Sequence, residues 1–558
     1  MKPSENTLLL SAGLVAATLI FAYPLVLPTP LLEPDEGLHA TISQEMVEHN
    51  EWIVPTFRGE PFLDKPILFF WAQMISLKAF GMTEFAVRLP GLLFGLLGTI
   101  TAGLLAGRLF GSRTGWYAWL ISMTMCIPLA VAQAAVHDVA LVPWTNLALL
   151  CLWETERAAS RRRQLGWLAG AACMFGLAFL TKALIGVAVI GVGYALFLIV
   201  SRQLSIGNCL RLAAAIVVGA LIASPWFIAM EFRVTGYLHY YFIERHVMGF
   251  ATATHRHGNS PWWYYAPYMM AGAIPWIWYA VPLIQDEWHR RSEPLRARPQ
   301  LVFVLCWLFG GLLFLSLAKS KLVTYALPLF PAIAIVCAEA WNRHAARQLS
   351  EVSARWFLNL IRFMTALGVI VPLGILIVCQ MIIGNTWPAF AWLAAFTLSA
   401  GSGITWWAIE RKRLNGSVGL IAVWVGGVVC LVMTWPLQNF AENYSERSLA
   451  RWVNEQETLP EHLILIGEKP GSVIFYLRKE VRQQRRRNQV TSMRIDELQP
   501  GTQPGSGEIF AVTNKVLYEH RLPDQHVPGS FTQQVGQFRL YRDQENALSL
   551  SQILWRSE

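Results

Sequence analysis

Acidic and basic side chains stand directly beside long apolar runs in this 558-residue chain. Glu33, Asp35 and Glu36 follow the first run, and Asp64 and Lys65 precede the second. Polar side chains beside membrane spans are functional candidates, because inserting each one costs about 2.5–3.5 kcal/mol. A carboxylate can activate or orient an acceptor, and lysines can stabilise a departing phosphate. Together these groups suit glycosyl transfer from a lipid-phosphate sugar.

Further candidates occur in later connections between the apolar runs. They are His137 and Asp138; Lys182; Glu244, Arg245, His246, His255, Arg256 and His257; and Lys319, Lys321 and Tyr325. The predicted topology places all of them on the outer side of a membrane. Separate loops are therefore expected to bring acids and bases to one leaflet.

A purely structural role is the alternative for each acid. Asp35 can cap the helix that it precedes, and Glu36 can be only a partner of the helix dipole. Asp64 and Lys65 can form a local ion pair of little consequence. Asp138 stands at a helix start, where it too can act as a cap.

The basic residues have structural alternatives as well. Lys319 and Lys321 can snorkel from the ends of apolar helices. Lys182 lies between two apolar helices, where a lone cation requires an anionic partner. His255 and His257 form a single HxH pattern, which is weak support for a metal site, and ordinary surface histidines are favoured.

The elements that must position these residues are membrane spans. Hydrophobic residues make up 54% of the chain and charged residues 15%, and the mean hydropathy of +0.40 excludes an ordinary soluble protein. Apolar runs of about 17–25 residues predict thirteen transmembrane helices. We place them at 8–27, 85–107, 115–135, 139–155, 166–181, 183–201, 210–230, 263–285, 300–318, 322–341, 357–382, 387–408 and 416–438.

Two features of these spans need interpretation. The first run lacks a small-residue cleavage site, so we expect a retained span and not a removed signal peptide. Thr181 and Lys182 interrupt one apolar stretch, so residues 166–201 form either two spans or one. The eight cysteines lie in or at the edges of apolar runs without any CxxC pair, and we expect them to be small buried hydrophobic residues.

The distribution of Lys and Arg fixes the orientation. Short loops on the side of the N-terminus are rich in these residues, as in the runs 161–163 and 411–413, whereas the longer loops on the other side have fewer. The positive-inside rule therefore predicts a cytoplasmic N-terminus in a bacterial inner membrane. The formal net charge of +9 is then a topology signal and not a sign of nucleic-acid binding.

The chain is predicted to have two domains. Residues 1–440 form the transmembrane domain, with long outer loops at 28–83 and 231–262, and the first loop contains two helical patterns too short to cross. Residues 441–558 form a soluble periplasmic α/β domain. Its predicted elements are a helix at 445–457, strands at 462–467, 508–513 and 537–542, a helix at 515–520, and an unassigned segment at 472–477.

Five stretches carry a pattern that belongs to a known family. They read "EPDEGLHATISQEMVEHNEWIVPTFRGEPFLDKPILFFW" (33–71), "HDVALVPW" (137–144), "LTKALIG" (180–186), "ERH" with "WWYY" (244–265), and "AKSKLVTYALP" (318–328). These stretches resemble the GT-C glycosyltransferases of the protein O-mannosyltransferase superfamily, and most closely the lipid A aminoarabinose transferase (ArnT) family. The resemblance covers the membrane domain and is weak over the C-terminal domain.

The resemblance implies roles for individual residues. Asp35 is similar to the catalytic carboxylate and Asp138 to an active-site acid. Lys65 and Lys182 are the implied donor-phosphate contacts, and Tyr325 is similar to a cavity-lining tyrosine. Glu36, Arg256, Lys319 and Lys321 are further candidates for donor-phosphate or substrate binding. Asp64 and His246 are the implied positions for a divalent metal in a zinc-like structural site, although no cofactor is required for certain. The chain differs from the family pattern at Leu38 and His39, where the family has Arg and Tyr, and at Asp64, where it has Glu.

The sequence therefore predicts a polytopic, mainly α-helical membrane glycosyltransferase. Its expected partners are membrane lipids, an undecaprenyl-phosphate-linked sugar donor and an outer-leaflet acceptor such as lipid A. The absence of a P-loop and of GxGxxG agrees with a donor that carries no nucleotide. The alternatives are a protein O-mannosyltransferase or another envelope-glycan transferase, and then a lipid or sugar transporter, which intramembrane charges also mark.

Overall fold

The fold is seen in a computed structural model of the whole chain. The structure describes residues 15, 27, 29–32, 34–248, 260–289, 297–383, 389–410, 417–455, 462–466, 471–479, 490–493, 508–513, 531–535 and 538–542. Most of the predicted first span, 8–27, and the predicted helix 515–520 lie outside these residues.

The chain divides into two compact units. The membrane unit comprises Met1–Leu27, Leu63–Phe69 and Arg88–Thr434. The second unit joins Pro28–Phe62 and Phe70–Val87 to Trp435–Glu558. Most of the first predicted outer loop therefore belongs to the same compact unit as the C-terminal part of the chain.

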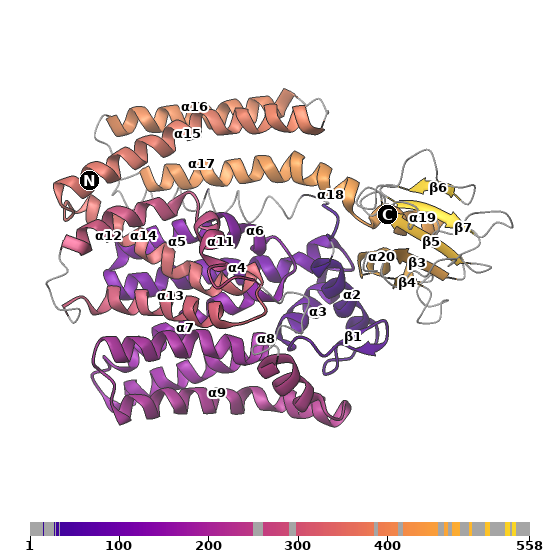
Figure 1. Cartoon of the computed structure of the whole chain (residues 1–558), viewed down its shortest axis with the longest axis horizontal. Coiled ribbons are helices and arrows are strands. Elements are labelled where there is room, and N and C mark those ends of the chain that lie inside the picture. Colours follow the sequence, from indigo (N-terminus) through magenta and orange to yellow (C-terminus); the bar gives the residue numbers. More distant parts are fainter. Residues whose placement is uncertain are drawn as a thin grey trace. The chain divides into compact units, whose positions relative to one another are not determined.

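The membrane unit is helical in its described residues (Figure 1). Its helices are α4 (Glu84–Phe110), α5 (Ser112–Met123), α6 (Cys126–Ala132), α7 (Leu141–Thr155), α8 (Arg161–Val200), α9 (Ile206–Arg233), α11 (Tyr265–Gly272), α12 (Ala280–His289), α13 (Pro299–Leu317), α14 (Phe330–Ala345), α15 (Glu351–Ile383), α16 (Ala389–Glu410) and α17 (Ser417–Val432). Short 3-10 helices are η3 (His137–Ala140), η5 (Trp276–Tyr279) and η7 (Val323–Leu329), and π-helices are η4 (His239–Met248) and η9 (Met433–Leu437). The first residues of α4 and the last three residues of η9 belong to the second unit.

Six of the described helices are long and apolar enough to cross a membrane. A seventh crossing results if α5 and α6, which are bent by 66° at their junction, form one span. This number is smaller than the thirteen predicted spans because most of the first predicted span lies outside the described residues and because several predicted runs are broken or merged. The run 263–285 is divided into α11, η5 and α12, and the two predicted spans 166–181 and 183–201 correspond to α8 to within one residue at its end.

Helix α8 reverses direction within its 40 residues. Lys182 (φ −151°, ψ 23°) and Ala183 (φ 42°, ψ −127°) have non-helical backbone angles. A Cβ atom on Gly186 would lie 3.0 Å from the carbonyl oxygen of Ala178, so the chain folds back on itself at this break. Tyr194, late in α8, also donates a hydrogen bond to Glu156, which precedes α8. The two halves of α8 are therefore antiparallel and meet at Lys182.

Small residues allow the membrane helices to pack closely. A Cβ atom on Gly115 of α5 would lie 2.8 Å from the carbonyl oxygen of Gly103 in α4, and one on Gly219 of α9 would lie 2.9 Å from that of Ala172 in α8. Any larger residue would force these backbones apart. Close backbone approach of this kind is typical of helix packing in membranes.

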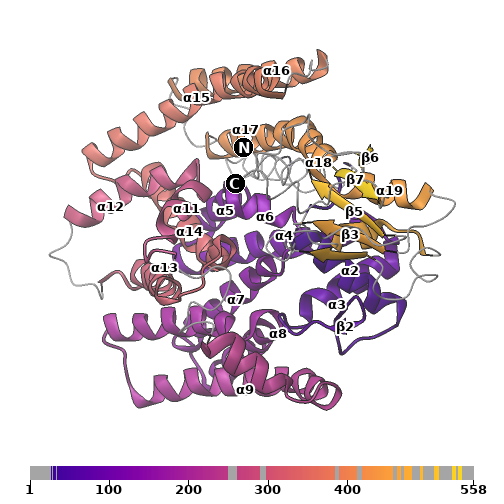
Figure 2. The same ribbon diagram turned by 45° about the vertical axis from the view of Figure 1, so that its right-hand side comes forward.

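The second unit contains a mixed five-stranded sheet (Figure 2). The strand order is β4-β3-β5-β7-β6, with β4, β3 and β5 parallel to each other and β5, β7 and β6 antiparallel. The strands are β3 (His462–Ile466), β4 (Val490–Met493), β5 (Glu508–Thr513), β6 (Phe531–Val535) and β7 (Phe538–Arg542). The described strands β3, β5 and β7 agree with the three predicted strands to within one residue. Strands β4 and β6 were not predicted.

Helices accompany this sheet in the second unit. They are α2 (Asp35–Glu48), α3 (Leu68–Phe80, whose first two residues belong to the membrane unit), α18 (Gln438–Tyr444), α19 (Arg447–Glu455) and α20 (Gly471–Tyr476). The unassigned segment 472–477 is therefore mostly helix α20. Leu449 and Val453 of α19 pack with Leu463, Leu465 and Phe538 of the sheet in one buried core. Both helical patterns predicted in the first outer loop are confirmed, as α2 and α3.

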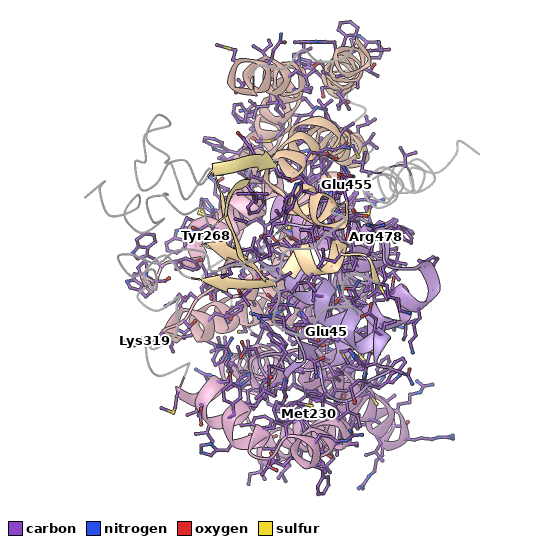
Figure 3. All side chains as sticks on the ribbon, turned by 90° about the vertical axis from the view of Figure 1, so that its right-hand side faces the viewer. Glu45, Met230, Tyr268, Lys319, Glu455 and Arg478 are labelled. Atoms are coloured by element: carbon purple, nitrogen blue, oxygen red, sulfur yellow. The ribbon has the colours of Figure 1, made fainter. Side chains whose placement is uncertain are left out.

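A small hairpin is held against α2. Strands β1 (Thr56–Phe57) and β2 (Glu60–Pro61) are joined by Arg58 and Gly59, both of which have positive φ. Two such residues in a row are typical of a tight hairpin turn. The carboxylate of Glu45, labelled in Figure 3, accepts hydrogen bonds from the backbone N–H groups of Arg58 (2.6 Å) and Gly59 (3.1 Å). Glu45 therefore fixes the turn to α2.

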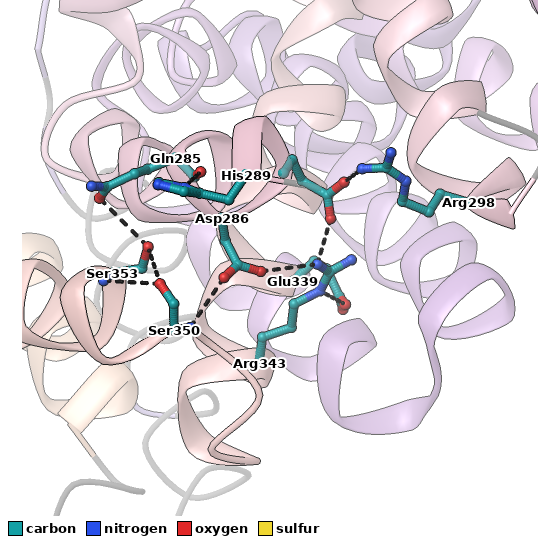
Figure 4. Close-up of polar contacts among 9 residues, drawn as sticks. Gln285, Asp286, His289, Arg298, Glu339, Arg343, Ser350 and Ser353 are labelled. Atoms are coloured by element: carbon teal, nitrogen blue, oxygen red, sulfur yellow. Dashed lines mark hydrogen bonds and ion pairs between the residues drawn. The ribbon is translucent and has the colours of Figure 1, made fainter. Parts of the chain in front are cut away.

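A buried ionic network joins α12, α13 and α14 in the membrane unit (Figure 4). Arg343 donates to Glu339 from Nε at 2.9 Å and to Glu287 from a terminal nitrogen at 2.6 Å. Glu287 also pairs with Arg298, and Asp286 accepts a hydrogen bond from the backbone N–H of Ser350 at 3.0 Å. These residues lie beside the loops whose positive charge predicts a cytoplasmic location.

Arg343→Met is expected to lower the free energy of unfolding by about 3–5 kcal/mol, because it leaves buried carboxylates without their cation. Arg355→Met is the matched control. It breaks an ion pair of the same i,i+4 spacing with Glu351, but these two side chains are 78% and 92% exposed. The control should cost less than about 1 kcal/mol. Unfolding in mixed micelles measures both free energies of unfolding. Equal losses would contradict the conclusion that the ion pairs of Arg343 matter more because they are buried.

Candidate active site

The break in α8 places Lys182 at the tip of a helical hairpin. Ala183 has a φ of 42°, a value that residues with a Cβ atom rarely adopt. Backbone strain of this kind persists only where the surroundings enforce it, and it is frequent at functional sites. The break ends the regular helix at Lys182 and directs the chain back into the membrane unit.

Lys182 forms a buried ion pair with Asp138. Asp138 is the second residue of η3, which leads into α7, and both side chains are only 6% exposed. A buried charge is tolerated when an opposite charge and hydrogen bonds compensate it. The structure therefore supplies the anionic partner that the sequence required for Lys182, and the Asp138 carboxylate pairs with this lysine.

Tyr325 completes this first cluster. It belongs to η7, and the Lys182 ammonium lies 3.7 Å from the centre of its ring. A cation over an aromatic face is attracted by the ring quadrupole, and the attraction is stronger where water is excluded. Three predicted site residues from three distant parts of the chain therefore meet at one place.

A second cluster surrounds Asp64. Its carboxylate accepts a hydrogen bond from the Tyr240 hydroxyl at 2.8 Å and lies 3.3 Å from Nε of Arg245. Asp64 is thus paired with the second outer loop, and not with its neighbour Lys65. Burial and the Asp64 carboxylate raise the pKa of Tyr240 to about 12, so this hydroxyl remains a donor at neutral pH. Within the described part of the chain, Lys65 has no carboxylate at ion-pair distance.

His246 belongs to the same π-helix as Tyr240 and Arg245. Its Nδ1 is 2.7 Å from the carbonyl oxygen of Tyr241, which can only accept, so Nδ1 carries the proton. Burial lowers the pKa of His246, and the positive charges of Arg245, Lys65 and Lys182 lower it further. The imidazole is therefore neutral at neutral pH.

The described residues do not fit the implied metal site. No group of three or more His, Cys, Asp or Glu side chains in the described ranges is arranged to hold a metal ion. Asp64 is instead neutralised by Arg245 and bonded to Tyr240. A structural zinc site requires about four protein ligands. No step proposed below uses a metal.

The remaining candidate cations have different environments. Lys321 is buried and donates to the backbone carbonyl oxygens of Ala318 (2.5 Å) and Ser260 (3.1 Å), so it ties two loops together. Burial, together with Lys319, lowers the pKa of Lys321. Lys319 itself is exposed (Figure 3). Arg256 lies outside the described residues.

The two acids after the first run belong to the second unit. Asp35 is the first residue of α2 and is exposed, and the helix is preceded by Pro34, whose side chain offers no capping group. Glu36 is buried and accepts a hydrogen bond from the backbone N–H of Leu32 at 3.0 Å. Glu36 therefore supports the local turn. The proximity of Asp35 to Lys65 and Lys182 stays a prediction.

Three tyrosines near the second cluster were not selected from the sequence as site residues. Tyr240 binds Asp64, Tyr241 accepts from His246 through its carbonyl group, and the rings of Tyr237 and Tyr241 stack with centres 5.3 Å apart. A signal for Tyr240 and Tyr241 is the run "HYYFIERH" (239–246), in which aromatic residues stand within one or two helical turns of Glu244, Arg245 and His246. Arg245 was named from this run but was given no role.

Comparison with known proteins gives consistent matches. The sequence pattern of the dolichyl-phosphate-mannose-protein mannosyltransferase family matches residues 64–228. The chain is 33% identical over 334 residues to an undecaprenyl phosphate-alpha-4-amino-4-deoxy-L-arabinose arabinosyl transferase of Proteus mirabilis, with 59% of each chain covered. It is 30% identical over 459 residues to such a transferase of Yersinia pestis, with 79% of this chain and 81% of the relative covered.

The fold also resembles that of a solved structure. The crystal structure of ArnT from Cupriavidus metallidurans bound to undecaprenyl phosphate superimposes with a TM-score of 0.71 at 21% identity, covering 97% of this chain and 98% of that chain. At this identity the likeness concerns the fold alone. The sequence match to the Proteus mirabilis relative, and to another from Erwinia tasmaniensis, spans about three-fifths of those proteins, at 59% and 61% of their length.

A double-mutant cycle tests the buried pair. Asp138→Asn and Lys182→Met should each lower the free energy of unfolding by about 3–5 kcal/mol, because each leaves one buried charge uncompensated. The double variant should recover most of this loss, since it buries no charge. Unfolding of all four proteins in mixed micelles gives the coupling energy, and strictly additive losses would mean that the two groups do not interact.

Proposed function

Because the chain belongs to the family of the undecaprenyl phosphate-alpha-4-amino-4-deoxy-L-arabinose arabinosyl transferases, we propose that it is an integral membrane glycosyltransferase. The proposed donor is 4-amino-4-deoxy-L-arabinose linked to undecaprenyl phosphate, and the proposed acceptor is lipid A in the outer leaflet. The observation that carries the proposal is the cluster of Lys182, Asp138 and Tyr325. It offers positive charge to a lipid phosphate in a protected place.

The proposed arrangement in the membrane follows the predicted topology. Thirteen spans cross a bacterial inner membrane, the N-terminus is cytoplasmic, and the active site faces the periplasm. Residues 441–558 form a periplasmic α/β domain. The helical hairpin of α8 supports this count, because its two antiparallel halves can each serve as one span.

Lys65 is the proposed primary contact of the donor phosphate. Among the described residues no carboxylate neutralises it, so its charge is available to an incoming anion. Asp138 pairs with Lys182, and the Tyr325 ring lies over its ammonium group. We propose that Asp138 holds this ammonium in position, and that its positive charge acts on the same phosphate.

The proposed reaction is a direct displacement at the anomeric carbon. An acceptor oxygen forms a bond to this carbon while the bond to the phosphate oxygen breaks, and the electron pair leaves with undecaprenyl phosphate. Lysine charge stabilises the leaving group. If the acceptor is a hydroxyl, Asp35 takes its proton. If it is an ionised lipid A phosphate, Asp35 orients it and stabilises positive charge on the sugar ring. The anomeric configuration is inverted in either case.

A second acceptor class has specific support. The pattern of the dolichyl-phosphate-mannose-protein mannosyltransferase family matches residues 64–228, which include Lys65, Asp138 and Lys182. The same site chemistry would serve a transferase that acts on proteins or on another envelope glycan. Mass spectrometry of lipid A and of envelope proteins from a deletion strain separates these acceptors, because only the true acceptor loses the sugar mass.

Asp35→Asn should lower the turnover number about 10²–10⁴-fold, the usual effect of removing a general base or orienting carboxylate. The assay uses the purified full-length chain, the undecaprenyl-phosphate-linked sugar and lipid A, with the product measured by mass spectrometry. Glu48→Gln, an exposed acid at the other end of α2, is the control and should remain active. Near-normal turnover by purified Asp35→Asn would refute the assignment.

Lys65→Ala should raise the KM for the donor about tenfold or more, since a hydrogen bond to a charged group is worth about 1.5–3 kcal/mol. Lys78→Ala is the matched control, because Lys78 contacts Asn50 and Trp52 in the second unit. The same assay at varied donor concentration measures both. A donor KM unchanged from the wild-type chain would remove Lys65 from the proposed phosphate site.

A further inference from the structure

Helix α2 is buried along most of its length although much of its sequence is polar. Thr41 and Ser43 are fully buried, and Gln44 is 1% exposed. Buried polar groups need hydrogen-bond partners, because an unsatisfied group costs stability. Ser43 donates to Gln73 of α3 at 2.8 Å. The partners of the other two side chains come from a distant part of the chain.

Thr41 and Gln44 both bind the backbone of α20. The Thr41 hydroxyl donates to the carbonyl oxygen of Gly471 at 2.6 Å, and the Gln44 amide donates to that of Phe475 at 3.2 Å. The last carbonyl groups of a helix lack partners within the helix, and Gln44 satisfies one of them. Figure 1 shows α20 beside α2, so these contacts hold the two helices together along a shared side.

Tyr476 fixes the segment that enters α2. The backbone N–H of Leu31, four residues before Asp35, donates to the Tyr476 hydroxyl at 2.8 Å. The same hydroxyl donates to Glu84 at 3.0 Å, and Arg447 pairs with Glu84 at 3.1 Å. One tyrosine therefore links the chain immediately before Asp35 to the start of α4 and to α19.

Helix α20 is packed against other elements of the C-terminal part of the chain. Val473 and Leu477 contribute to the buried core that contains Leu463 and Leu465 of β3. The carboxylate of Glu446 accepts hydrogen bonds from the Ser472 hydroxyl at 2.9 Å and from the Val473 N–H at 3.3 Å. A continuous set of contacts thus runs from the sheet through α20 to α2.

We propose that the C-terminal part of the chain positions the catalytic carboxylate, with Thr41, Gln44 and Tyr476 as its positioning residues. This proposal rests on the proposed function, because it assumes that Asp35 acts in transfer. At 1.5 Å per residue, Thr41 and Gln44 lie about 9 and 14 Å from Asp35 along the helix axis. They therefore act through the placement of α2 and do not contact the reacting atoms.

The expected effect of disturbing these contacts is on kcat and not on the donor KM. Displacing a reacting group by about 1 Å can cost about 10²-fold in rate. Donor binding is assigned to Lys65 and Lys182, which belong to the membrane unit and have no part in these contacts. A loosened α2 should therefore lower kcat and leave the donor KM unchanged.

The experiment compares Thr41→Val and Tyr476→Phe with Thr365→Val in the full-length chain. Thr365 is also a buried helical threonine, but its hydroxyl donates to Ile361 within its own helix α15. Thr41→Val and Tyr476→Phe should each lower kcat about 10–100-fold with the donor KM within about twofold of wild type. Thr41→Ser, which keeps the hydroxyl, should restore kcat. Thr365→Val should keep both parameters.

Hydrogen–deuterium exchange tests whether Thr41 and Tyr476 hold α2 in place, without relying on activity. Residues 31–48 should exchange about tenfold faster in Thr41→Val and in Tyr476→Phe, and at the wild-type rate in Thr365→Val. Gln44→Met replaces Thr41→Val if the latter does not fold, and the same result is expected.

The outcomes separate this proposal from the proposed function. A wild-type chain without transfer activity refutes the proposed function. Faster exchange in the variants would still show that Thr41 and Tyr476 hold α2 in place. An active wild type with unchanged kcat and unchanged exchange in the variants overturns the positioning role. Loss of activity through the donor KM, or an equal loss of kcat in Thr365→Val, overturns it as well.

Discussion

The buried ion pair between Lys182 and Asp138 constrains the architecture of the candidate site. Neither charge is tolerable alone in a medium without water, so each requires the other. The pair can form only because α8 breaks at Lys182 and reverses, and because η3 presents Asp138 before α7 begins. Tyr325 then covers the ammonium from a third segment. One electrostatic requirement thereby fixes the relative placement of three stretches that are far apart in the sequence.

The proposed catalytic and phosphate-binding residues are divided between two compact units of the chain. The membrane unit contains the cationic residues Lys65 and Lys182, and the second unit contains Asp35 at the start of α2. Because α2 is bound to α20 by side chain to backbone hydrogen bonds, its placement depends on residues more than four hundred positions later. Ala40, Ile42 and Met46 of α2 are fully buried, and these hydrogen bonds satisfy polar groups that are buried with them.

Buried charge in this chain does not by itself identify a catalytic group. The side chains of the network around Arg343 are also largely buried, but its cations are enclosed by Asp286, Glu287 and Glu339. That network stabilises the contact of α12 with α14. The candidate site differs because Lys65, a proposed contact of the donor phosphate, has no carboxylate at ion-pair distance among the described residues. Excess positive charge, and not burial, is what suits it to an anionic lipid.

The sequence by itself determined the membrane class, most of the membrane helices within the described residues, the strands β3, β5 and β7, and the set of charged residues from which the cluster is drawn. These follow from apolar run length, from alternation and from the cost of inserting charge, which are local properties. Tertiary structure alone decided that Asp138 pairs with Lys182, that Asp64 binds Tyr240 and Arg245 instead of Lys65, and that α2 joins the C-terminal sheet. These pairings form only when the folded chain brings the side chains together. A local sequence pattern does not predict that two residues 44 or 430 positions apart will be in contact.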